Sequence, residues 1–69
     1  MVDPQAKNRA QQFSRLFRKA GVYLAKGQVE LALAVFREGE ALALTHGDEE
    51  KLAIFREEIA RCRHHLQQG

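Results

Sequence analysis

The segment from Tyr23 to Gly39 constrains the fold most, because it spaces small and aromatic residues as a tightly packed pair of helices requires. Gly27 interrupts the segment where a chain can reverse direction. Small residues let two helices approach closely, while aromatic rings fill the space beside them. Residues of both kinds recur at helical intervals, beginning with Ala20 just before the segment: Ala20, Tyr23, Ala32, Phe36 and Gly39. The segment therefore predicts a helical hairpin.

Helix start and stop signals divide the 69 residues into three expected helices. Pro4 suits a first helical turn with Asp3 as its N-cap, and Gly27 suits the left-handed position after a helix end. Gly47 gives a second stop, and Asp48 follows it as a second N-cap. These signals predict helices over residues 4–26, 29–46 and 49–67.

The apolar residues of each expected helix indicate how the three pack. In the first helix they recur in steps of four and three, the period of one buried face: Ala6, Ala10, Phe13, Phe17, Ala20 and Leu24. The middle helix has six consecutive apolar residues over 31–36, which is more than one turn, so it has to be covered on more than one side. The third helix has one apolar stripe: Leu52, Phe55, Ile59, Cys62 and Leu66. The predicted fold is an all-α, antiparallel three-helix bundle in a single domain, residues 1–69.

This pattern resembles one tetratricopeptide repeat followed by a capping third helix. The resemblance covers residues 13–46 and is carried by Ala20, Tyr23, Gly27, Ala32, Phe36 and Gly39. It departs at Lys19, Leu44 and Arg56, where the family has an apolar residue, a proline and a small residue. The resemblance implies a peptide groove along the inner face of the first helix: Ser14, Phe17, Gly21, Leu24 and Ala25. The alternative that Phe17 and Leu24 complete a small core stays open.

One repeat-like unit forms a core near the lower size limit for independent stability, so we expect a partner that completes it. The partner is a second copy, a larger repeat protein or a single helix, which makes the chain an adaptor, an oligomer or the small subunit of a complex. Ile54, on the outer side of the third helix, is a further candidate contact. Residues 28–46 and 48–66 also resemble the microtubule-interacting and trafficking domain, which implies an amphipathic peptide beside the third helix.

Charge is distributed unevenly along the chain. The net charge is +2, but residues 1–26 carry +5 and the remainder carries −3. Four cations form a basic stripe on the first helix: Arg15, Arg18, Lys19 and Lys26. This polarity favours self-association of a basic end with an acidic end, or an anionic partner, and makes nucleic-acid binding the alternative function. The absence of a reading motif and of aromatic residues among the cations counts against nucleic acid.

Residue patterns that would indicate catalysis, a metal or a membrane are weak or missing. Cys62, His64 and His65 are neighbours, but only Cys62 and His65 share a helix side, and a zinc site normally takes four ligands. A cysteine on an apolar stripe is usually inert, and there is no glycine-rich phosphate loop. We expect no enzyme activity, cofactor or metal. No apolar run reaches the roughly 18–20 residues of a membrane span, and no secretory signal is recognisable, so we expect a cytoplasmic protein.

Overall fold

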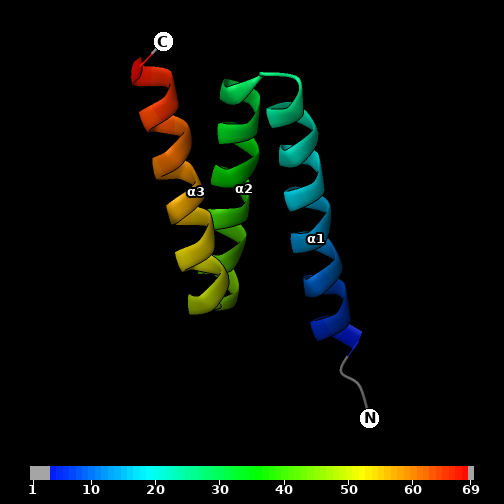
Figure 1. Ribbon diagram of the computed structural model, residues 1–69. Helices are drawn as coiled ribbons and strands as arrows, with labels where there is room; N and C mark the ends of the chain where they lie inside the picture. Colours follow the sequence, from blue (N-terminus) through cyan, green and yellow to red (C-terminus); the bar gives the residue numbers. More distant parts are fainter. Residues whose placement is uncertain (1–3, 69) are drawn as a thin grey trace.

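The computed structural model describes residues 4–68, with side chains from residue 7 onward. It contains three α-helices, α1 Pro4–Ala25, α2 Val29–His46 and α3 Glu49–Gln68, and residues 4–68 include no strand. The helices lie side by side and alternate in direction, with α2 in the middle (Figure 1). The predicted all-α bundle is therefore confirmed, and the predicted helix ends agree with the observed ones to within one residue.

A left-handed glycine ends each of the first two helices. Gly27 has a φ of 74° and Gly47 a φ of 65°, values that glycine adopts without the steric cost of a Cβ atom. After α1, the Gln28 N–H donates a hydrogen bond to the Tyr23 carbonyl at 2.8 Å. A backbone hydrogen bond that spans six residues at a helix end, together with a left-handed glycine, is characteristic of the Schellman motif. Both glycines thus have the backbone role that the sequence predicts.

Asp48 starts α3 as its N-cap. Its side-chain Oδ1 accepts a hydrogen bond from the Lys51 N–H at 3.0 Å, which satisfies one of the free N–H groups of the first turn. Glu49 and Glu50 place negative charge in the same turn, where the helix dipole favours it. The equivalent prediction for Asp3 lies outside the described residues.

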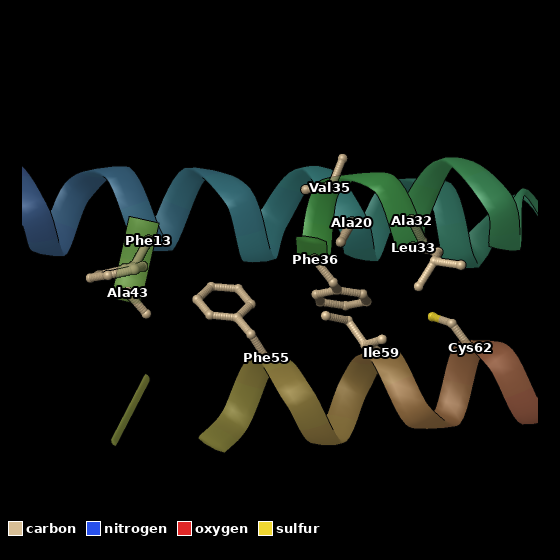
Figure 2. Close-up of a cluster of buried hydrophobic side chains, with 10 residues drawn as sticks. All are labelled: Phe13, Ala20, Ala32, Leu33, Val35, Phe36, Ala43, Phe55, Ile59 and Cys62. Atoms are coloured by element: carbon tan, nitrogen blue, oxygen red, sulfur yellow. The ribbon is translucent and has the colours of Figure 1, made fainter. Parts of the chain in front are cut away.

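Most of the core side chains lie between α3 and the α1–α2 pair, whereas Val35 points away from α3 (Figure 2). Its buried side chains come from all three helices: Phe13, Ala20, Ala32, Leu33, Val35, Phe36, Ala43, Phe55, Ile59 and Cys62. The middle helix α2 packs against both α1 and α3, as its apolar run predicts. Across residues 4–68 the backbones of α1 and α3 stay apart, so these two helices meet through side chains.

Four phenylalanine rings join the helices at one level of the bundle. Phe17 of α1 stacks on Phe55 of α3 with ring centroids 4.6 Å apart and planes 8° apart. Phe13 and Phe36 lie 5.7 Å and 6.4 Å from the Phe55 ring. Gly39 of α2 makes room for this ring, because a Cβ at position 39 would overlap it. The lack of a side chain at Gly39 therefore allows Phe55 of α3 to pack directly against α2.

The ends of the predicted apolar stripes are less buried than expected. Ala10, Leu24 and Leu66 are exposed, Leu24 by 40% and Leu66 by 37%. The prediction that they are buried is wrong, because periodicity identifies a face of a helix but not how far the neighbouring helix covers it. The side chain of Ala6 lies outside the described residues. Within residues 4–68 no helix is long and apolar enough to cross a bilayer.

Candidate docking cleft

A cleft of about 430 Å³ lies between α1 and α3 near the turn that connects α1 to α2. Leu24 of α1, Val29 of α2 and Cys62 of α3 give it apolar walls from all three helices. The rest of its lining is Gly27 in the turn and three polar side chains of α3: Glu58, Arg61 and His65. We call this site the interhelix cleft.

The aromatic contact between α1 and α3 determines where the cleft opens. Phe17 is half-buried and its stack with Phe55 bridges the two helices. Leu24 lies two turns further along the same side of α1. It has no aromatic partner across the gap and remains 40% exposed. The cleft therefore lies beyond the aromatic stack, at the end of the bundle where Leu24 and Gly27 line it.

A second hollow of about 490 Å³ continues the cleft around the end of the bundle. The two share Gly27, Val29 and His65 as lining residues. The second hollow adds Leu31 and Leu66, which are 47% and 37% exposed. Contiguous exposed apolar side chains with a polar rim are typical of surfaces that bind another protein.

Charged groups of α3 form the rim of the cleft. Arg61 donates hydrogen bonds to Glu57 and Glu58, each at 2.9 Å, so its guanidinium is held within its own helix. Burial raises the pKa of the Cys62 thiol, and the nearby Glu58 carboxylate raises it further. A thiol with a raised pKa stays neutral and acts as an apolar wall. Within residues 7–68, no group of three His, Cys, Asp or Glu side chains is placed to hold a metal ion.

The four residues predicted from sequence to bind a partner have different environments. Phe17 is half-buried among the aromatic rings, whereas Gly21 is exposed and a Cβ there would meet open space. Leu24 is exposed and lines the cleft. Ile54 is half-buried and lies one turn before Glu58, hence on the cleft side of α3 and not on its outer side. Contact of any of these residues with a partner stays a prediction.

The predicted basic stripe is solvent-exposed over its whole length. Arg15, Arg18, Lys19 and Lys26 are all exposed. The ion pairs between described side chains that the structure gives involve Arg56 and Arg61, and none of the four stripe cations has a described carboxylate within 4.0 Å. These four charges are therefore available to an anionic surface.

Sequence reasoning missed the part of the cleft that α2 and α3 contribute. Val29, Cys62 and His65 line it, but the sequence alone gave them no role in binding. A signal was present, since Leu24 and Val29 flank Gly27 and a tight turn brings its flanking residues together.

Comparison of the chain with protein-family models, with curated proteins and with solved structures finds no match.

Proposed function

We propose that this chain is a non-enzymatic docking module, a tetratricopeptide-like adaptor that receives the apolar side of a partner helix or peptide in the interhelix cleft. The observation that carries the proposal is Leu24, an exposed leucine at the mouth of a cleft that all three helices border. The apolar walls supply the hydrophobic contact, and the charged α3 rim supplies polar contacts around it.

The size and continuity of the surface support a helical ligand. An amphipathic helix presents apolar side chains at positions i, i+3 or i+4, and i+7, so its binding groove needs several apolar contacts in a row. The cleft offers Leu24 and Val29, and the adjoining hollow continues with Leu31 and Leu66. These two hollows, of about 430 and 490 Å³, therefore accommodate more than one apolar side chain of the ligand.

The family resemblances support the same location. The tetratricopeptide resemblance implies ligand contacts on the inner face of α1, where Leu24 lies. The resemblance to the microtubule-interacting and trafficking domain implies a peptide beside α3, where Glu58 and His65 lie. The interhelix cleft is bordered by both of these helices, so a ligand bound there is compatible with either resemblance.

Replacing Leu24 by aspartate tests the proposal. A carboxylate at the mouth of the cleft loses the apolar contact and opposes an apolar ligand, so we expect affinity to fall by about 2 kcal/mol, or about thirtyfold. The ligands are peptides enriched from a displayed random library on the immobilised wild-type chain, and affinity is measured by fluorescence anisotropy.

Val22→Asp is the matched control. Val22 is also an exposed apolar residue of α1, 48% accessible, but it points to the opposite side of the helix. Both variants should keep the wild-type helical circular dichroism. Peptides that bind Leu24→Asp as tightly as the wild type, or that lose affinity equally for both variants, would rule out the cleft as the docking site.

Nucleic-acid binding is the second candidate function, and it is supported by the exposed basic stripe, whose cations form no ion pair with the described side chains. If phosphate contacts by Arg15, Arg18, Lys19 and Lys26 drive binding, retention on heparin and on duplex DNA should fall steeply as salt rises. A chain that is not retained even at low salt does not have this function.

A further inference from the structure

A separate hollow of about 450 Å³ lies on the seam between α1 and α2. Its lining comes from these two helices and includes no residue of the interhelix cleft: Gln12, Arg15, Leu16, Glu38, Ala41, Leu42 and Thr45. Phe17 points toward α3, where it stacks on Phe55, while its neighbour Leu16 lines this hollow. The hollow therefore opens on the side of the α1–α2 pair that faces away from α3, and we call it the seam hollow.

The seam hollow combines an apolar floor with opposite charges on its two rims. Leu16 and Leu42 are half-buried and Ala41 is exposed. Arg15 stands on the α1 rim and Glu38 on the α2 rim, and both are exposed. Among the side chains that the structure describes, neither has an oppositely charged group within 4.0 Å. A carboxylate of another molecule would therefore pair with Arg15 on the α1 rim, and a cation of another molecule would pair with Glu38 on the α2 rim.

We propose that a second copy of this chain packs on the seam hollow, related by a two-fold axis that runs along the seam. In a two-fold interface the same patch faces itself, so a contact from residue i to residue j is matched by one from j to i. This axis places α1 of one copy over α2 of the other. Arg15 then faces Glu38 of the second copy, and Glu38 faces the second Arg15.

The charge distribution and the dimensions of the chain agree with this arrangement. The basic α1 of each copy lies over the acidic α2 of the other, since residues 1–26 carry +5, whereas residues 27–46 carry three carboxylates, Glu30, Glu38 and Glu40, and one cation, Arg37. A stable interface buries about 800 Å² from each partner. The principal extents of the molecule are 48, 21 and 13 Å, so helices that pair along most of its length supply an area of this order.

The dimer leaves the interhelix cleft of each copy open, because cleft and seam hollow lie on different sides of the α1–α2 pair. A dimer therefore presents two clefts, and a ligand with two binding segments gains avidity from their connection. The inference does not rest on the proposed function, since the two surfaces share no residue.

Charge reversal across the hollow tests the dimer. Sedimentation equilibrium should give twice the single-chain mass of 7.8 kDa for the wild type. Arg15→Glu and Glu38→Arg should each weaken association at least tenfold, because each creates two like-charge contacts in the dimer. An equal mixture of the two variants should restore it, since a heterodimer then has both opposite-charge contacts. Rescue by mixing requires a contact between copies, because a contact within one chain stays broken in both variants.

Arg63→Glu is the control for net charge. It changes the charge by the same amount as Arg15→Glu, but Arg63 is exposed on α3 and lines neither hollow, so association should be unchanged. A wild-type chain that remains at 7.8 kDa up to about 1 mM, where even a millimolar complex is populated, would overturn the proposal. An equal mixture of Arg15→Glu and Glu38→Arg that stays monomeric would also overturn it. So would a dimer that Leu24→Asp dissociates but Arg15→Glu does not. Salt-dependent retention on heparin by a chain that never self-associates would also contradict the proposal.

Discussion

Replacing Gly39 by alanine tests the packing that joins α2 to α3. A Cβ at position 39 would lie well within 3.0 Å of three atoms of the Phe55 ring. Phe55 has no exposed surface, and Phe17 and Phe13 pack on its ring at 4.6 Å and 5.7 Å. The ring therefore has no free space into which it can move without displacing a neighbour.

Two effects of opposite sign determine the size of the change. Alanine favours a helix interior over glycine by about 1 kcal/mol. Overpacking a filled core costs typically about 1–3 kcal/mol, and overlap with an enclosed ring falls at the upper end of that range. We expect a net loss of about 2 kcal/mol, against the roughly 3–5 kcal/mol that a core of this size supplies. At about 4–8 °C for each kcal/mol, Tm should fall by about 8–16 °C.

Thermal and urea unfolding followed by circular dichroism measure this loss. Gly21→Ala is the matched control, because Gly21 also lies within a helix but a Cβ there would meet nothing within 4 Å. It should raise stability by about 0.5–1 kcal/mol. A Gly39→Ala chain as stable as the wild type, or more stable, would refute the described contact between Gly39 and Phe55.

Two further predictions follow from the helix end and the buried thiol. Asp48→Ala removes the acceptor for the Lys51 N–H and should cost about 1 kcal/mol in urea unfolding, with the loss absent from Asp48→Asn because asparagine also caps helices. Stability of the wild type should fall as pH rises above 9.0, the ordinary pKa of a cysteine thiol, because the unfolded chain then releases a proton that the folded chain retains owing to its raised pKa. Cys62→Ala should remove this part of the alkaline loss; an identical pH profile in that variant would contradict a raised pKa at Cys62.

The helix ends are predictable from sequence because local chemistry determines them. Gly27 and Gly47 adopt left-handed backbone conformations that other residues take up only at a cost, and Asp48 places a carboxylate beside free N–H groups. The packing of α2 against a helix on more than one side is also predictable, since six consecutive apolar residues span more than one side of a helix. None of these inferences depends on knowing which residues meet across the bundle.

Contacts between distant segments are the part that the sequence does not predict. Gly39 fits the spacing of an α1–α2 hairpin, but its close neighbour is Phe55, sixteen residues away on α3. Leu24 continues a buried stripe by periodicity, yet α3 does not cover it and the cleft opens there. Both outcomes depend on how the helix axes diverge (Figure 1), which is a property of the assembled bundle.

Amide chemical-shift mapping tests the central claim of a docking cleft between α1 and α3 most directly. The ¹⁵N-labelled chain is titrated with a peptide enriched from the displayed library, and the shift changes are placed on the structure. We predict that they concentrate at Leu24, Val29, Cys62 and His65, with Arg15 and Glu38 unaffected. Changes centred on the seam hollow or on the outer side of α3, with the cleft residues unmoved, would contradict the account.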